Sequence, residues 1–123
     1  MKKLIPLMMC LVLSVMAFAQ TGVDFQHLTF DEALAKAKAE KKLVFVDCYT
    51  TWCGPCKTMT PIIKEIAKEH NEIKFVKVDV DKNEELAIKY NVMSIPTMII
   101  MKDGKVTKTF VGVTDKESII REF

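Results

Sequence analysis

Three features that would define a structural class are scarce or missing in this sequence. Its longest apolar run, Leu4 to Ala19, is 16 residues long and contains Pro6, whereas a membrane-spanning helix needs roughly 20 apolar residues. Charge of one sign is not in large excess, since 18 Lys and Arg face 16 Asp and Glu. Cysteine is scarce, with four in 123 residues. These absences argue against a spanning helix, a nucleic-acid-binding protein and a fold stapled by several disulfides.

The first 19 residues have the pattern of a signal peptide. Two lysines at the start precede the apolar stretch, and Ala17-Phe18-Ala19 has the small-x-small pattern of a signal-peptidase site. We expect cleavage after Ala19 and export to the periplasm. A retained membrane anchor is the alternative. Lipidation at Cys10 fits less well, because the preceding Met9 is larger than the residue such a signal requires.

The remaining chain, residues 20–123, is predicted to form one compact domain. Removing residues 1–19 leaves 104 residues, enough for one domain, and no repeat, low-complexity tract or linker interrupts them. The two leader lysines are lost with the signal peptide, so 16 basic residues face 16 acidic ones. Three cysteines remain, Cys48, Cys53 and Cys56. This odd number suggests one working pair and one spare thiol.

The Cys53-Gly54-Pro55-Cys56 motif is the most informative part of the sequence. It lies where an apolar strand is predicted to give way to a helix. The first turn of a helix has unpaired N–H groups and a positive dipole end, which stabilise a thiolate at Cys53. Pro55 suits an early helical position, and Gly54 keeps bulk away from the sulfur. The motif predicts thiol–disulfide exchange, with Cys53 as the exposed, attacking sulfur and Cys56 as the more buried one.

Hydrophobic periodicity predicts alternating strands and helices along the domain. We expect them at residues 23–28 (a weak strand), 30–42 (helix), 43–49 (strand), 53–70 (helix), 74–80 (strand), 82–90 (helix), 97–101 (strand), 106–113 (strand) and 115–123 (helix). Capping patterns precede three of the helices: Thr29 with Glu32, Asp81 with Glu84, and Thr114 with Glu117. Asp103-Gly104 predicts a hairpin turn, and Pro61 a kink within its helix. The order predicts an α/β fold with a central mixed sheet flanked by helices.

Two segments together resemble the thioredoxin family. They are Trp52-Cys53-Gly54-Pro55-Cys56-Lys57, with Pro61 five residues on, and Ser94-Ile95-Pro96-Thr97. The Asp-Gly turn and Gly112 also occur in the family's order and at its usual separations. The resemblance covers nearly all of residues 23–123, and residues 30–42 look most like the small exported thioredoxin-like proteins of bacteria. It implies a thioredoxin fold and a thiol-disulfide oxidoreductase that needs no cofactor.

The resemblance also assigns roles to other residues. Asp47 matches the family's buried acid, which acts through water as a proton acceptor for the resolving cysteine, and burial should raise its pKa. Lys77 matches the lysine beside that acid, and a purely structural Asp47 paired with Lys77 is the alternative. Pro96 matches the family's cis-proline, which leaves the Ile95 backbone free to pair with an extended substrate segment. The expected substrate-binding residues are Trp52, Gly54, Pro55, Ile95 and Pro96.

Several positions depart from the family's pattern. Cys48 stands where an aromatic residue is usual, and strand alternation points it to the opposite side from Asp47. A buried, inert thiol is therefore favoured over a redox role for Cys48. Tyr49-Thr50-Thr51 replaces the commoner Trp-Ala-acid stretch, and the last helix is short. Residues 80–90 leave no room for the insert of the membrane-associated relatives that serve cytochrome maturation.

The residues around the dithiol resemble those of reducing thioredoxins, with Gly-Pro between the cysteines and Ile before Pro96. We expect a monomeric protein-disulfide reductase that acts on disulfide-containing client proteins, with a membrane thiol transporter as electron donor and no nucleic-acid partner. A disulfide-forming oxidase or isomerase of the same fold is the alternative, and a non-catalytic docking module a further one. A zinc site would need ligands beyond the dithiol, but Cys48, His27 and His70 show no paired spacing, so no metal is expected.

Overall fold

A computed structural model describes residues 29–123 of the chain. The signal peptide predicted at residues 1–19 and the strand predicted at residues 23–28 lie outside the described residues. The elements are α1 (Phe30–Ala39), β1 (Val44–Tyr49), α2 (Gly54–Glu69), β2 (Lys74–Asp79), α3 (Glu84–Lys89), β3 (Thr97–Lys102), β4 (Lys105–Val111) and α4 (Lys116–Ile120). Within residues 29–123, no helix has both the length and the apolar character needed to cross a membrane.

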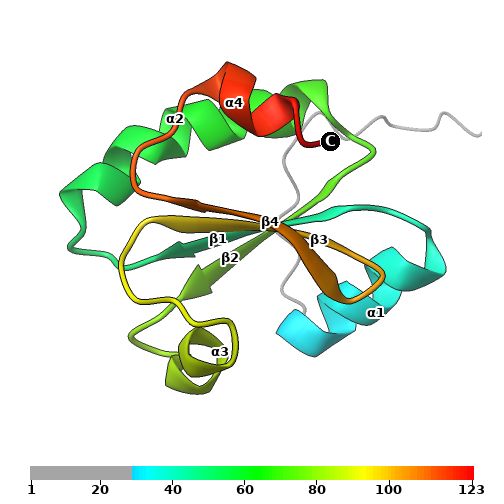
Figure 1. The fold of residues 1–123 in the computed structure, drawn as a ribbon, viewed down its shortest axis with the longest axis horizontal. Coiled ribbons are helices and arrows are strands. Elements are labelled where there is room, and N and C mark those ends of the chain that lie inside the picture. The colour runs from blue at the N-terminus through cyan, green and yellow to red at the C-terminus, as the bar shows by residue number, and fades with distance from the viewer. Residues whose placement is uncertain (1–28) are drawn as a thin grey trace, which may run out of the picture.

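The four strands form one mixed sheet in the order β2-β1-β3-β4. β1 pairs in parallel with β2 and antiparallel with β3, and β3 pairs antiparallel with β4. Figure 1 shows α2 and α4 on one face of this sheet and α1 and α3 on the other. The parallel pair is joined by the crossover helix α2, as a parallel connection requires. The predicted α/β fold, a central mixed sheet flanked by helices, is confirmed.

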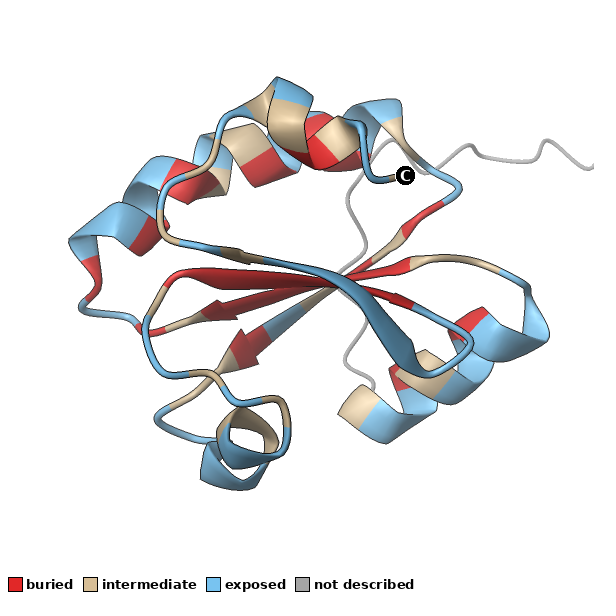
Figure 2. Cartoon of the chain, in the orientation of Figure 1, coloured by how far each residue is buried: buried red, intermediate tan, exposed pale blue. Residues whose placement is uncertain are grey.

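Each face of the sheet has its own apolar core because side chains alternate along β1. On the α2 face, Phe45 packs with Phe75 of β2, with 5.1 Å between the ring centroids, and with Met59 of α2. On the α1 face, Val46 and Cys48 pack in a second cluster. Figure 2 shows the two central strands buried along most of their length and the edge strand β4 mostly exposed. β1 is therefore covered on both faces and paired on both edges.

The capping box predicted for α1 is present. The Thr29 hydroxyl accepts the Glu32 N–H at 3.2 Å, and the Glu32 carboxylate accepts the Thr29 N–H at 2.9 Å. The helix ends at Ala39 rather than at the predicted Lys42. Lys41 has a left-handed backbone with φ of 56°, a conformation that ends a helix.

The caps predicted for α3 and α4 are wrong by one or two positions. The N-cap of α3 is Asn83, and its side chain makes no capping hydrogen bond. The carboxylate of Asp81, the predicted cap, instead accepts a hydrogen bond from the Trp52 indole. The N-cap of α4 is Asp115 rather than Thr114, and its carboxylate accepts the Ser118 N–H at 2.8 Å. Aspartate is the stronger N-cap residue of the two, which accounts for the shift. α4 also ends at Ile120, before the predicted Phe123.

The β3–β4 hairpin turns at Asp103-Gly104, as predicted. Asp103 and Gly104 have φ of 52° and 77°, the left-handed pair that a tight two-residue hairpin loop requires. β4 ends at Val111 rather than at Val113 because Gly112, with φ of 83°, turns the chain. The Gly112 N–H donates to the Pro96 carbonyl at 2.8 Å, which ties the end of β4 to the start of β3.

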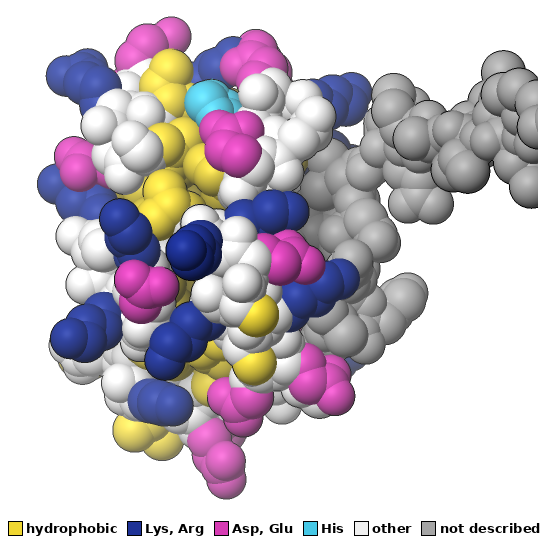
Figure 3. Space-filling view, turned by 90° about the vertical axis from the view of Figure 1, so that its right-hand side faces the viewer, with side chains coloured by type: hydrophobic (Ala, Val, Ile, Leu, Met, Phe, Trp, Pro, Cys, Tyr) yellow, Lys and Arg dark blue, Asp and Glu magenta, His cyan; other side chains and the backbone are white. Residues whose placement is uncertain are grey.

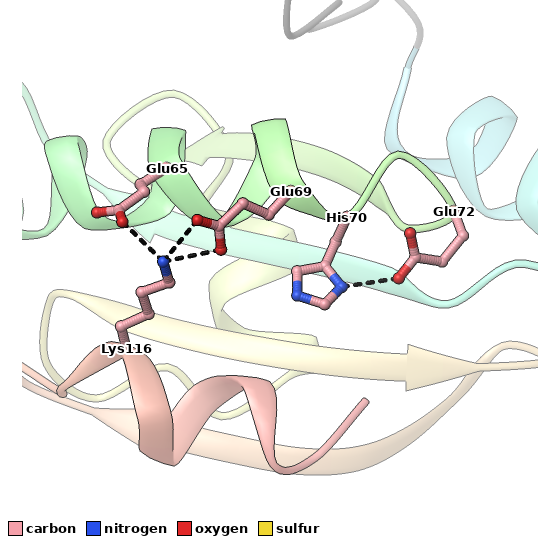
Figure 4. Close-up of polar contacts among 5 residues, drawn as sticks. All are labelled: Glu65, Glu69, His70, Glu72 and Lys116. Carbon is pink, nitrogen blue, oxygen red and sulfur yellow. Dashed lines mark hydrogen bonds and ion pairs between the residues drawn. The ribbon is translucent and has the colours of Figure 1, made fainter.

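Charged side chains hold α4 against α2 (Figure 4). The Lys116 ammonium donates to the carboxylates of Glu65 and Glu69 at 2.7 and 2.8 Å. His70, the C-cap of α2, lies with Nδ1 2.7 Å from the Glu72 carboxylate, and its ring meets Phe123 edge-on. These contacts hold the short last helix over the α2 core.

The side of the molecule away from the start of α2 carries charges of both signs. Figure 3 shows Lys, Arg, Asp and Glu side chains interspersed over this face, with apolar side chains between them. A hollow of about 610 Å³ on this side is lined in part by Lys42, Leu43 and Phe123. None of its lining residues is a predicted site residue.

Candidate active site

The junction between β1 and α2 places the two cysteines. Cys53 is the N-cap of α2, and its sulfur accepts the Cys56 N–H at 3.1 Å. Pro55 occupies the second helical position, where its missing N–H removes no helical hydrogen bond. The Cα atoms of Cys53 and Cys56 are 5.3 Å apart, and the two sulfurs form a disulfide. The two cysteines therefore lie in the N-cap and the first turn of α2, as the sequence predicted.

The expected difference in exposure between the two sulfurs is wrong. Cys53 is 4% exposed and Cys56 is 7% exposed, so neither is accessible as a whole side chain in the disulfide form. The N-cap geometry explains this, because it turns the Cys53 side chain back over the first helical turn. Gly54 and Pro55 between them are exposed. A difference in reactivity between the cysteines must come from their positions relative to the helix end.

Asp47 is buried on the α2 face of the sheet. It is 6% exposed and lies two residues after Phe45 of the α2 core, hence on the same face of β1. Loss of solvent raises its pKa from 3.8 to about 6, and the positive charge of Lys77 acts in the opposite direction. The predicted rise in pKa by burial is confirmed. Asp47 is consequently a carboxyl group that changes protonation close to neutral pH.

Lys77 lies beside Asp47, as the resemblance implied. The two residues are direct register partners across the parallel β1–β2 pair. The Lys77 ammonium also lies 4.4 Å from the ring centroid of Tyr49. The lysine therefore stands over the carboxyl end of β1, and its charge lowers the pKa of Asp47 relative to burial alone.

Trp52 stands on the surface next to the dithiol, with 70% of its area exposed. Its indole N–H donates to the Asp81 carboxylate at 2.8 Å. Sequence reasoning missed this role of Asp81, because the two residues are 29 positions apart and the local pattern favoured a helix cap. The bond fixes the orientation of an exposed aromatic ring beside the sulfurs.

The Ile95–Pro96 loop reaches the same end of the sheet. The peptide bond between these residues is cis, as predicted, and Pro96 is buried while Ile95 is partly exposed. The following residue, Thr97, is in register with Cys48 of β1, so the loop lies beside the end of β1 that leads to the dithiol (Figure 1). Exposed apolar side chains flank it in Met93 and Val111. The structure thus brings the Cys53–Cys56 segment and the Ile95–Pro96 loop to the same end of the sheet.

Cys48 faces away from this site, as strand alternation predicted. It is 4% exposed within the apolar cluster on the α1 face and is a free thiol. Burial, and to a smaller extent the charge of Asp47, raises its pKa to about 12. Because the thiolate is the reactive form, this cysteine is inert at neutral pH.

The described residues contain no cluster of three or more potential metal ligands among His, Cys, Asp and Glu. His70 is held by Glu72 at the far end of α2 from the dithiol. His27, the other possible donor weighed from the sequence, lies outside the described residues.

Comparisons with known proteins agree with this geometry. The profile of the family described as Thioredoxin matches residues 22–123. The thioredoxin of Bacillus subtilis is 45% identical over 84 residues, which are 68% of this chain and 81% of that protein. The thioredoxin of Listeria monocytogenes is 43% identical over 89 residues, 72% of this chain and 86% of that protein. The X-ray structure of Fasciola hepatica thioredoxin superposes with a TM-score of 0.68 at 38% identity, covering 76% of this chain and 93% of that one. The chain therefore belongs to the thioredoxin family and is a thioredoxin-type thiol-disulfide oxidoreductase with a Cys53–Cys56 pair.

Proposed function

We propose that this protein is an exported reductase of protein disulfides, acting in the periplasm on disulfide-containing client proteins. The observation that carries the proposal is the position of Cys53, at the N-terminus of a 16-residue helix with its sulfur accepting a backbone N–H. Hydrogen bonding and the helix dipole both stabilise negative charge on that sulfur. A stabilised thiolate is the attacking species in disulfide exchange.

In the first step, the Cys53 thiolate attacks one sulfur of the client disulfide. A new sulfur–sulfur bond forms between Cys53 and the client, and the second client sulfur leaves as a thiolate that takes up a proton. The reduced Cys56 is then the only other thiol of the pair, and its Cα lies 5.3 Å from that of Cys53. This spacing allows the second step without movement of the helix backbone.

In the second step, Cys56 loses its proton and attacks the Cys53 sulfur. The mixed disulfide breaks, the client leaves with both sulfurs reduced, and the two electrons it received have come from the Cys53–Cys56 pair, which is now a disulfide. Asp47 is the proposed proton acceptor for Cys56. Its pKa of about 6 supports this role, because the carboxyl is ionised at neutral pH yet basic enough to take a proton. Lys77 supports the ionised form through its charge.

Client binding is proposed to use the backbone beside Pro96. Ile95 is partly exposed just before the start of β3, where an extended segment could add main-chain hydrogen bonds. Trp52, Gly54 and Pro55, which adjoin Cys53 and Cys56 in the sequence, are exposed as well. Main-chain pairing with few side-chain contacts supports a broad range of clients rather than one substrate.

The reducing direction is supported by the residues between the cysteines. Neither Gly54 nor Pro55 carries a charged or hydrogen-bonding side chain that would stabilise the thiolate further. A strong oxidase needs an unusually stable reduced form, for which these residues provide no source. An exported reductase must be reduced again by an outside donor, and a membrane thiol transporter is the proposed one.

The test is reduction of insulin disulfides by residues 20–123 with dithiothreitol as electron source, followed by precipitation of the insulin B chain. We expect faster precipitation with the wild-type protein than with dithiothreitol alone and no acceleration by Cys53→Ser. Cys48→Ser is the matched control, because that thiol is buried on the opposite face, and it should retain activity. Equal rates with and without the wild-type protein would reject the reductase and favour a docking role.

Export has a separate test. The full chain is produced in a Gram-negative host, the cells are fractionated, and the mass of the intact protein is measured. A periplasmic product that begins at Gln20 is the expected result. A cytoplasmic product that keeps Lys2 and Lys3 would reject export while leaving the thiol chemistry untouched.

A further inference from the structure

A buried hydroxyl three residues before Cys53 lacks a hydrogen-bond partner among the described residues. Thr50 is 3% exposed, and its Oγ1 has no hydrogen-bond partner among the described residues. Thr97 is equally buried, yet its hydroxyl donates to the Ser94 carbonyl at 2.6 Å. Because nearly all buried polar groups in folded proteins are hydrogen-bonded, an unpaired one calls for an explanation, and a redox role is among the known ones.

Thr50 lies between the strand and the helix that hold the active site. It follows Tyr49, the last residue of β1, and precedes a turn at residues 51 and 52 that leads to Cys53. The first and last residues of such a turn have Cα atoms within about 7 Å of each other. Thr50 therefore carries the buried hydroxyl nearest along the chain to the N-cap sulfur.

The charge on the Cys53 sulfur changes with the redox state of the pair. In the disulfide form, both sulfurs are bonded to each other and carry no negative charge. Reduction creates a thiolate at Cys53, and hydrogen bonds to a charged acceptor are considerably stronger than those to a neutral one. The backbone N–H of Cys56 already donates to that sulfur, and the lone pairs of a thiolate can accept a second hydrogen bond.

We propose that the Thr50 hydroxyl is a redox-dependent hydrogen-bond donor that pairs with the Cys53 sulfur when the disulfide is reduced. The inference rests on the proposed function only in requiring that the pair cycles between disulfide and dithiol. Thr50 thereby tunes the reduction equilibrium of the site. The unpaired hydroxyl disfavours the disulfide form, and the bond formed on reduction favours the dithiol form.

The equilibrium with glutathione measures this tuning. Two glutathione thiols reduce the Cys53–Cys56 disulfide, yielding the protein dithiol and one glutathione disulfide, so two electrons and two protons pass to the protein. Thr50→Val removes the hydroxyl at nearly constant volume. We expect the equilibrium constant for reduction to fall by roughly three- to tenfold, in the range of one hydrogen bond.

Two control variants isolate the hydroxyl. Thr50→Ser keeps the donor and should leave the equilibrium close to that of the wild type. Thr51→Val makes the same chemical change one residue on, where the side chain is exposed, and should have no effect. A shift of equal size in Thr51→Val would overturn the assignment to Thr50.

Unfolding of both redox forms separates a redox role from a merely structural one. For Thr50→Val we expect the oxidised form to melt at the same or a higher temperature and the reduced form to melt lower. A hydroxyl held by a buried water in both forms would shift both melting temperatures alike and leave the glutathione equilibrium unchanged, which would overturn the proposal. If Thr50→Val does not fold, Thr50→Ala provides a second variant without the hydroxyl.

A separate experiment tests whether Cys53 is the sulfur that accepts the Thr50 hydrogen bond. In a Cys56→Ser background, Thr50→Val should slow alkylation of Cys53 by iodoacetamide at neutral pH, because less of it is thiolate. A shifted glutathione equilibrium without slower alkylation would overturn the pairing with Cys53. None of these measurements requires insulin reduction, so failure of the reductase proposal and failure of this one are told apart.

Discussion

Replacing Asp47 with asparagine should stabilise the protein in a pH-dependent manner. The pKa of Asp47 is raised from 3.8 to about 6 in the folded state. The folded protein therefore binds the Asp47 proton more tightly than the unfolded chain, and the stability of the wild type falls as pH rises from about 4 to about 6. At about 1.4 kcal/mol per pKa unit, the ionised Asp47 costs about 3 kcal/mol above pH 6.

The assay is urea unfolding of the oxidised protein at pH 4 and at pH 7.5. The free energy of unfolding of Asp47→Asn minus that of the wild type should grow by ~2 to 3 kcal/mol between the two conditions, because asparagine stays neutral at both. Asp103→Asn is the matched control. It makes the same change at an exposed turn position, where the carboxylate keeps its solvent in the folded state.

The same Asp47→Asn substitution should lower the rate of disulfide reduction although it raises the stability. Without a proton acceptor for Cys56, insulin reduction by Asp47→Asn should be slower at neutral pH, on the order of tenfold or more if general-base catalysis is lost. A stability difference that does not vary with pH would refute the desolvation argument. Unchanged turnover together with increased stability would make Asp47 a purely structural acid.

Three further predictions concern the cysteines. Cys56→Ser should accumulate mixed disulfides with client proteins, detected by mass spectrometry, whereas Cys53→Ser should trap none, and equal trapping would reject Cys53 as the attacking thiol. The oxidised wild-type protein should melt at a higher temperature than the reduced one in calorimetry, because a stabilising disulfide corresponds to a low reduction potential. The reverse order would place the protein among disulfide-forming oxidases. With the Cys53–Cys56 disulfide intact, iodoacetamide should not modify Cys48 in the folded protein but should modify it after unfolding in urea, since burial raises the pKa of that thiol to about 12.

The parts of the site that follow from neighbouring residues could be predicted from the sequence. The apolar run of β1, the Cys53-Gly54-Pro55-Cys56 helix start and the Asp103-Gly104 turn each depend on contacts within a few positions. The burial of Asp47 and its raised pKa could be predicted because the flanking strand residues are apolar. Resemblance to a family supplied the cis-proline, which no local pattern specifies.

The features that sequence reasoning missed depend on residues far apart in the chain. Asp81 suited a helix cap, but an indole 29 positions away competes for its carboxylate. The equal burial of Cys53 and Cys56 depends on how the N-cap side chain folds back and on what covers it. Thr50 looked like a loop residue, and only the packing around the end of β1 buries its hydroxyl.

The position of Asp47 shows how the fold keeps an energetically unfavourable buried carboxyl group in place. β1 is bonded on one edge to β2 and on the other to β3, and each of its faces is covered by an apolar cluster. A strand held in this way cannot rotate to release one side chain to solvent, because a shift of one residue would break its pairing with β2 and β3 and would move Phe45 from the α2 core into the cluster on the α1 face. The two cores offset the free-energy cost of Asp47, and the sheet fixes its location. We therefore expect that variants which loosen β1, such as Phe45→Ala, lower the pKa of Asp47 toward its ordinary value by admitting water.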